Sequence, residues 1–362
     1  MKKKKRRVLL VIILIIGIGI LSYLYFSDYK KNKSKVVTKK SEVKEKTKEE
    51  ENKDDILPTI ELIGREEITL VKNSIYEEKG ARATDNIDGD ITDNIEIKGS
   101  VDTTNVNEYT IEYIVKDSSN NKASVKRKVN VIDVTEKNTS GIPVLMYHYF
   151  YDDTVGETGK DANYLAKSKF EEQVKYLKEN DYYFPTMKEI SMYLDGNLDL
   201  PKKSVVITID DGEASSYSIA YPLAIKYKVP MVMFVVTSWT NPEDELQESM
   251  IETGYITMQS HTHDMHQGGC AGQKHGALIQ CIDHDKGVED MKKSSEILGS
   301  SDSMAYPCGD YNDHAIEILK EANYSLGFTT EYGKVTRSSN RYYLPRVRIN
   351  SGISLSYFID SL

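Results

Sequence analysis

Three of the seven histidines in this chain lie close together in the stretch "QSHTHDMHQ" at residues 259–267. A second polar cluster, "TIDDG" at residues 208–212, contains the adjacent carboxylates Asp210 and Asp211. Each cluster follows an apolar run. Taken alone, Asp-Asp-Gly is usually a turn, and a histidine-rich stretch is a polar loop or a metal site. Together, two imidazoles and one carboxylate form a ligand set that leaves open positions on zinc or another divalent ion.

This ligand set predicts the hydrolysis of an amide or an ester without a covalent intermediate. A zinc ion with three protein ligands lowers the pKa of its bound water to about 7. The second carboxylate of the pair can accept the proton of that water while the water attacks a carbonyl carbon. A backbone N–H can stabilise the oxyanion that forms.

The elements that must position these residues alternate between strands and helices. Apolar runs typical of buried strands are followed by amphipathic segments typical of helices, at residues 168–181, 185–196, 215–228, 286–299 and 313–324. Capping boxes are predicted for the first two, with Ser168 and Glu171 in one and Thr186 and Glu189 in the other. The alternation predicts an α/β fold at residues 141–362, most simply a (β/α) barrel with its active site at the carboxyl ends of the strands.

Residues 59–134 show a different pattern of short alternating runs. In two neighbouring runs the apolar residues share one face, namely Tyr109, Ile111, Tyr113 and Val115, and then Val125, Val129 and Val131. Period-two runs joined by turns predict an antiparallel β-sandwich, and residues 83–123 resemble the Ig-like modules of bacterial surface proteins. The candidate calcium ligands there are Asp85, Asp88, Asp90 and Asp93, although Asp-Gly turns are common without a metal.

The N-terminal residues predict attachment to a membrane. Residues 8–26 carry no charge and are just long enough to span a bilayer core of roughly 30 Å, and the basic tail at residues 1–7 is expected to stay in the cytoplasm. An uncleaved transmembrane signal anchor is therefore predicted, with a cleaved signal peptide as the alternative. Residues 27–58 are rich in Lys and Glu and predict a disordered stalk. The remaining domains are expected outside the cell.

Charge and cysteine content narrow the function classes. The net charge is −9, although residues 1–7 are strongly basic, so nucleic acid is not an expected partner. The three cysteines exclude a disulfide-dense scaffold. Cys270 and Cys281 are close enough in sequence to pair, and the third is Cys308.

Five stretches of residues 142–362 carry a specific resemblance, namely "IPVLMYH", "ITIDDG", "SHTHDMH", "AYPCGDY" and "LPRVRIN". This region resembles the polysaccharide deacetylases of the NodB-homology family, which are carbohydrate esterases. The resemblance implies a distorted (β/α) barrel that uses a divalent ion, most simply Zn²⁺ with Co²⁺ or Ni²⁺ as alternatives, to remove acetyl groups from sugars. It also implies that Asp210 is the general base and that Asp211, His261 and His266 are the metal ligands.

The histidine cluster departs from the commoner spacing of the family. Met265 stands where the last histidine usually lies, and His266 follows one residue later. The longer spacing resembles the branch that deacetylates the biofilm polymer poly-N-acetylglucosamine. It leaves His263 as an alternative ligand; otherwise His263 is expected to shape the loop.

Other family positions also differ. In "AYPCGDY", Ala305 replaces an arginine that orients the base, and Cys308 replaces a tyrosine. The backbone N–H of Cys308 can still face the oxyanion, and Arg346 or Arg348 could supply the missing guanidinium. The late histidine that acts as general acid in the family has no counterpart. His148 is the remaining candidate for that role, or else a structural histidine.

Two aromatic residues near predicted strand ends, Trp239 and Tyr149, could stack on a sugar ring or pack at the rim of the barrel. The leading hypothesis is a monomeric, single-pass membrane protein of a Gram-positive bacterium that deacetylates peptidoglycan N-acetylglucosamine in the cell wall. The resemblance implies that this change confers lysozyme resistance. An exopolysaccharide deacetylase is the second hypothesis, and a degenerate wall-binding module is the third.

Overall fold

The computed structural model describes residues 54–240, 250–272 and 275–362. The predicted basic tail, the predicted anchor and nearly all of the predicted stalk lie outside these residues. Among the helices of the described residues, none is both long and apolar enough to cross a bilayer.

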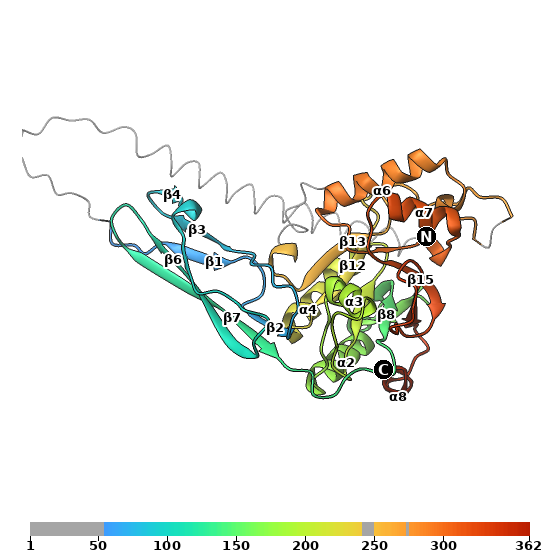
Figure 1. The fold of residues 1–362 in the computed structure, drawn as a ribbon, viewed down its shortest axis with the longest axis horizontal. Coiled ribbons are helices and arrows are strands. Elements are labelled where there is room, and N and C mark those ends of the chain that lie inside the picture. The colour runs from blue at the N-terminus through green and yellow to red at the C-terminus, as the bar shows by residue number, and fades with distance from the viewer. Residues whose placement is uncertain (1–53, 241–249, 273–274) are drawn as a thin grey trace, which may run out of the picture. The chain divides into compact units, whose positions relative to one another are not determined.

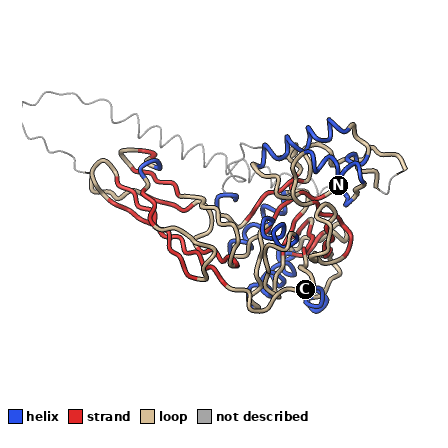
Figure 2. The backbone as a smooth tube through the Cα atoms, in the orientation of Figure 1, coloured by secondary structure: helices blue, strands red, loops and turns tan. Residues whose placement is uncertain are grey.

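The first folded region is built from two β-sheets (Figure 2). One sheet has the order β1-β3-β4, and the other has the order β2-β7-β6-β5. The strands are β1 (Thr59–Leu62), β2 (Glu67–Val71), β3 (Ala81–Asp85), β4 (Gly89–Asp90), β5 (Glu96–Lys98), β6 (Asn107–Lys116) and β7 (Lys122–Ile132), with a short 3₁₀ helix η1 at Thr92–Asn94. The predicted alternation is confirmed, because Ile111, Tyr113 and Val129 are buried. The pairing is not wholly antiparallel as predicted, since β2 runs parallel to β7.

The aspartates considered as calcium ligands separate in the structure. Asp88 and Asp90 each accept a hydrogen bond from a backbone N–H, as acidic turn residues commonly do. Asp85 instead lies with Asp54 and Asp117, and their carboxylate oxygens are within 4.8 Å of one another.

The second folded region is a closed barrel of parallel strands in the order β11-β12-β13-β14-β15-β16-β8 (Figure 1). The strands are β8 (Val144–Tyr147), β11 (Val206–Ile209), β12 (Met231–Val235), β13 (Ile256–Ser260), β14 (Met304–Ala305), β15 (Gly327–Tyr332) and β16 (Leu344–Arg348). A separate parallel pair is formed by β9 (Tyr149–Tyr151) and β10 (Tyr164–Ala166). The predicted barrel is therefore present, and it closes with seven strands.

Helices cover the outside of the barrel. They are α2 (Lys167–Glu179), α3 (Met187–Leu194), α4 (Tyr221–Tyr227), α6 (His284–Leu298), α7 (Asp313–Glu321) and α8 (Leu355–Ser361). A π-helical turn η3 (Ser216–Ala220) leads into α4, and short 3₁₀ helices lie at η2 (Asp153–Val155), η4 (Leu278–Gln280) and η5 (Pro307–Gly309). Helices α6 and α7 pack together over β14 (Figure 1).

One of the two predicted capping boxes forms. Thr186 and Glu189 cap α3 reciprocally, as predicted. The box predicted for α2 is wrong, because that helix begins at Lys167 and places Ser168 inside it. The Ser168 hydroxyl donates to Asp153 instead.

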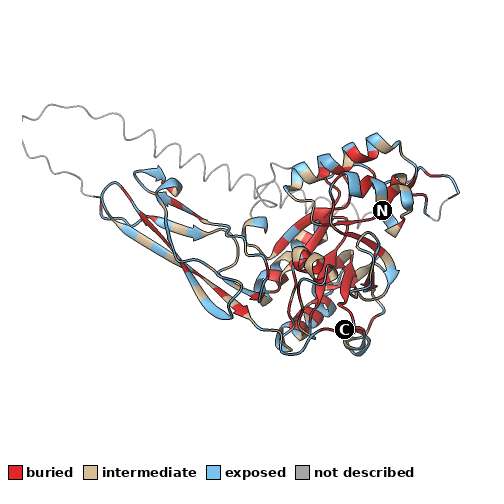
Figure 3. Ribbon diagram, in the orientation of Figure 1, coloured by how far each residue is buried: buried red, intermediate tan, exposed pale blue. Residues whose placement is uncertain are grey.

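The alternation of side chains along β11 points the carboxylate of Asp210 into the barrel. Ile207 and Ile209 pack into the cluster beneath the outer helices, whereas Val206 belongs to the cluster inside the barrel. All four residues of β11 are buried (Figure 3). Because side chains alternate along a strand, Thr208 and Asp210 continue the inward-facing series. The carboxyl end of β11 thus delivers Asp210 to the interior of the barrel.

Candidate metal centre and catalytic base

The three predicted metal ligands meet at the carboxyl ends of β11 and β13. Asp211 Oδ1 lies 3.3 Å from His261 Nε2 and 3.2 Å from His266 Nε2. Four ligand atoms bound to one ion at 2.0–2.1 Å stand roughly 3.3 Å apart in tetrahedral geometry. The three donors therefore fit a four-coordinate divalent ion, with a position left for water or substrate. His263 is not part of this group.

The other polar atoms of these ligands are held by the protein. His261 Nδ1 donates to the carbonyl oxygen of Ala305 at 2.7 Å, so Nε2 is the nitrogen that remains to bind an ion. Tyr149 donates its hydroxyl proton to Asp211 Oδ2, which leaves Oδ1 for the same purpose. Such partners fix the orientation of metal ligands and strengthen binding.

Asp210 forms a buried ion pair with Arg346. Both carboxylate oxygens accept hydrogen bonds from the guanidinium at 2.7 Å, and the two residues are 2% and 0% exposed. Burial alone would raise the pKa of Asp210, but the adjacent guanidinium outweighs burial and lowers it. Arg346 also donates to Thr208 Oγ1 and to the carbonyl oxygen of Thr329. Asp210 is therefore held as an oriented anion, which suits a general base.

Of the two candidate arginines, Arg346 is the one beside the base. Arg348 is exposed and donates to Asn163. His148 is close to the same carboxylate, with Nε2 4.0 Å from Asp210 Oδ2. Burial lowers the pKa of His148, although Asp210 opposes that effect. The imidazole is thus neutral near pH 7 and does not share a hydrogen bond with the base.

Cys308 lies in a tight turn next to the site. Its backbone is left-handed, with φ of 56°. The side chain is exposed, and partial desolvation with the nearby carboxylates of Asp310 and Asp211 raises the pKa of its free thiol. The hydrogen bonds of the turn come from Gly309 N–H and Asp310 N–H. Within the described part of the chain, the N–H of Cys308 has no acceptor, as an oxyanion donor requires.

Left-handed backbone also occurs at one of the three candidate metal ligands and at the residue that follows another. Asp211 and Thr262 both have φ of 74°. Such residues cost about 1–3 kcal/mol each and cluster at functional sites. Gly212, with φ of 69°, has no room for a side chain, because an added Cβ would lie 2.8 Å from Val235. The loop after β11 therefore has a strained backbone that lowers local stability and places the Asp211 carboxylate beside the two histidines.

Comparison with known proteins agrees with this geometry. Residues 60–131 match the family model for the Ig-like domain of bacterial surface proteins, and residues 197–327 match the polysaccharide deacetylase model. The chain is 34% identical over 201 residues to a poly-β-1,6-N-acetyl-D-glucosamine N-deacetylase of Staphylococcus aureus strain MRSA252, covering 51% of this chain and 68% of that protein. The chain belongs to the polysaccharide deacetylase family.

Solved structures of deacetylases share the barrel. The deacetylase PplD of Streptococcus pyogenes, in complex with acetate, superposes with a TM-score of 0.52 at 26% identity, covering 61% of this chain and 97% of that one. IcaB of Ammonifex degensii gives a TM-score of 0.51 at 26% identity, with 63% and 98% covered.

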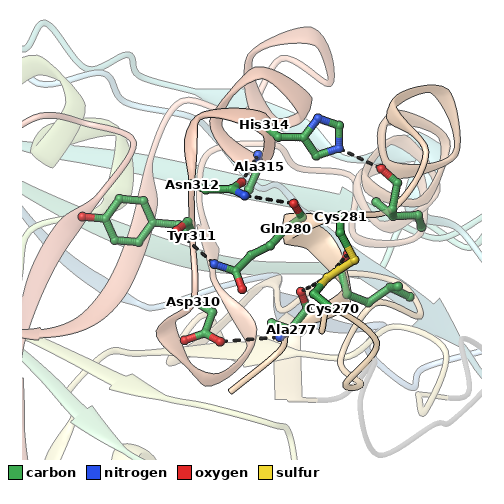
Figure 4. Close-up of a disulfide and its surroundings, with 11 residues drawn as sticks. Cys270, Ala277, Gln280, Cys281, Asp310, Tyr311, Asn312, His314 and Ala315 are labelled. Carbon is green, nitrogen blue, oxygen red and sulfur yellow. Dashed lines mark hydrogen bonds between the residues drawn. A yellow bond between two sulfur atoms is a disulfide. The ribbon is translucent and has the colours of Figure 1, made fainter. Parts of the chain in front are cut away.

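The deacetylase has a disulfide-closed loop beside the segment from Asp310 to Asn312 (Figure 4). Cys270 and Cys281 are bonded, which decides a pairing that the sequence left open. The loop is tied to this segment, because Asn312 Nδ2 donates to the carbonyl oxygen of Gln280 at 2.9 Å.

The remaining histidines of the deacetylase lie away from the three-donor group. Their partners are Asp310 for His275, Glu321 for His284 and the carbonyl oxygen of Ile282 for His314. His314, in the first turn of α7, is half-buried.

Sequence reasoning missed the function of Tyr149 in this site. The residue was considered as a platform for a sugar ring, yet its hydroxyl holds the ligand carboxylate and its ring lies 4.8 Å from that of Tyr164. No motif marks such a partner, because the contact joins residues far apart in the chain.

Proposed function

We propose that this polysaccharide deacetylase hydrolyses the N-acetyl groups of an N-acetylglucosamine polymer at the cell surface. The observation that carries the proposal is the pairing of a three-donor metal group with a buried, ionised base next to it in sequence. Asp211, His261 and His266 would hold the ion, and Zn²⁺ is the proposed metal because its usual ligands and geometry match this set.

The proposed reaction uses the side chains of the chain in fixed roles. When bound, the ion supplies Lewis-acid activation of water and of the acetyl carbonyl group. Asp210 accepts a proton from the attacking water, while Arg346 keeps the carboxylate ionised and oriented. The N–H of Cys308 donates to the oxyanion.

The departing amine nitrogen must then gain a proton as its bond to the acetyl carbon breaks. The proton that Asp210 accepted is returned to this nitrogen, and acetate and the free amine are the products. His148 Nε2 lies 4.0 Å from Asp210 Oδ2, too far for a direct hydrogen bond, and we assign it the relay of this proton through a bridging water.

The preferred substrate in this proposal is poly-β-1,6-N-acetylglucosamine. Its support is the 34% identity to the S. aureus enzyme named for that polymer, together with the long spacing from His261 to His266. Peptidoglycan is the second candidate, favoured by the sequence of residues 1–58, which predicts an anchor and stalk that would hold a monomeric enzyme in the cell wall. A degenerate wall-binding module is not supported, because such a module needs neither the donors nor an oriented base.

Acetate release tests the proposal. The full-length chain is stripped with a chelator and assayed with and without added zinc, on poly-β-1,6-N-acetylglucosamine and on N-acetylated peptidoglycan. Zinc-dependent acetate from the first polymer supports the preferred substrate, and acetate from peptidoglycan alone supports the second candidate. Asp211→Asn should abolish zinc-dependent release. Full activity of this variant, or no acetate from either polymer with a folded, zinc-loaded enzyme, would refute the proposal.

A further inference from the structure

An exposed indole stands directly beside one of the metal ligands. Trp239 is the only tryptophan of the chain, and it is 61% exposed. Its ring centroid lies 5.2 Å from that of His266, at an interplanar angle of 67°. The indole thus contacts this ligand side chain and still keeps most of its surface exposed. A tryptophan in such a place is suited to bind a ligand, because it combines a large apolar ring with a polar N–H group.

The turn that carries this indole is bonded to the metal-binding loop. The N–H of Thr237 donates to the carbonyl oxygen of Thr262 at 3.1 Å, and the N–H of Ser238 donates to that of His263 at 3.0 Å. The N–H of Trp239 closes the turn on Val236 at 2.9 Å. The backbone that carries the indole is therefore held at a fixed place relative to the ligands, so that binding against Trp239 orders little backbone that is not already ordered.

The third histidine of the cluster belongs to this connection. His263 Nδ1 lies 3.0 Å from Thr237 Oγ1, and its own N–H donates to Asp290 at 2.8 Å. His263 therefore joins the turn after β12 to the loop after β13 and to helix α6. Its side chain supports the position of the indole, whereas His261 and His266 offer their nitrogens to the ion.

We propose that the exposed face of Trp239 binds one pyranose ring of the polymer. This is the ring whose acetamido group reaches the three metal-ligand side chains. The proposal rests on the proposed function, and it adds a binding residue to it. In β-linked N-acetylglucosamine the ring substituents are equatorial, so each face of the ring presents axial C–H groups. Such a face is apolar and stacks on an indole, while the acetamido group extends from the edge of the ring. The edge that faces His266 would thus carry the acetyl group toward the metal ligands.

Intrinsic fluorescence tests binding without turnover, because one tryptophan gives the whole tryptophan signal. The full-length, zinc-loaded chain carrying Asp210→Asn is titrated with pentamers of β-1,6-linked and β-1,4-linked N-acetylglucosamine. A saturable change of tryptophan emission with at least one pentamer is expected. No change with either pentamer, at concentrations that saturate binding in calorimetry, would overturn the proposal.

Kinetics of acetate release provide the second readout. Trp239→Ala should raise KM on the order of tenfold or more and leave zinc affinity unchanged, and Trp239→Phe should recover much of the loss. Ile225→Ala removes an exposed apolar side chain of α4 and serves as the control, with KM unchanged. Wild-type KM in Trp239→Ala would refute the indole platform alone, whereas absence of acetate from the wild-type enzyme would refute the proposed function.

His263→Ala separates support of the turn from metal binding. This variant should keep its zinc affinity and bind the pentamers more weakly. Loss of zinc from His263→Ala, at a level equal to that of His266→Ala, would contradict the role given to His263.

Discussion

Replacing Arg346 with methionine should destabilise the barrel and abolish the function of Asp210 as a general base. Methionine keeps much of the apolar stem but removes the guanidinium that binds both oxygens of Asp210 at 2.7 Å. Both side chains are almost completely buried. Removing one partner of a buried ion pair costs about 3–5 kcal/mol, because the other charge stays buried without compensation.

The same change should reverse the pH dependence of the carboxyl group. In the wild-type protein the pKa of Asp210 is lowered, so its contribution to stability is present above the pKa of the unfolded chain and is lost as pH falls through the folded pKa. Without the guanidinium, burial raises the pKa of Asp210, and only the weaker influences of His148 and His261 oppose it. Stability of Arg346→Met should then fall as pH rises above the unfolded value of about 3.9.

Activity should follow the protonation state of the base. A base with a raised pKa stays protonated to higher pH, and loss of general-base catalysis lowers kcat/KM by about 10²–10⁴-fold. The acidic limb of the pH profile should move to higher pH. The measurements are acetate release from pH 5 to 9 and thermal unfolding over the same range, each on the full-length chain.

Two further variants isolate the cause. Arg341→Met removes a guanidinium that pairs with Asp195 at the surface, and it should cost at most about 1 kcal/mol. Combining Arg346→Met with Asp210→Asn should restore much of the lost stability and none of the activity, since the buried charge is gone. If Arg346→Met unfolds no more easily than Arg341→Met and keeps the wild-type pH profile, the reasoning is refuted.

Three other predictions concern the metal centre and the loop beside it. Tyr149→Phe should weaken zinc binding about 10–100-fold in a chelator competition; an unchanged zinc Kd would show that the hydroxyl is not needed to orient the ligand carboxylate. His266→Ala should lose zinc whereas His263→Ala retains it, and equal metal content measured after dialysis would contradict the ligand set. Converting both Cys270 and Cys281 to serine should lower the free energy of unfolding by about 3 kcal/mol for a loop of this length, and a thermal midpoint equal to the wild-type value would exclude that contribution.

The sequence by itself determined the types of element and the chemistry at their ends. Alternating apolar residues predicted the sandwich faces, and apolar runs followed by Asp211 and His261 predicted donors at strand ends. The two strands were expected to be neighbours, but β11 and β13 lie on either side of β12. These inferences succeed because they depend on short-range periodicity and on the rule that parallel strands present their carboxyl ends at one edge. The short separation of Cys270 and Cys281 made a disulfide possible, but only the structure showed that the two sulfur atoms are bonded.

Only the tertiary structure decided which distant residues complete the site. Arg346 and Arg348 are two residues apart on one strand. The local sequence does not predict which of their guanidinium groups contacts Asp210. The hydroxyl of Tyr149 reaches Asp211 across 62 residues of chain, and the edge of the Trp239 ring meets His266 only because β12 and β13 are neighbours. The predicted cap at Ser168 failed in the same way, because Asp153 takes its hydroxyl. Each of these contacts depends on the register of one strand or loop against another, and register is set by the packing of the whole barrel rather than by the residues nearby in sequence.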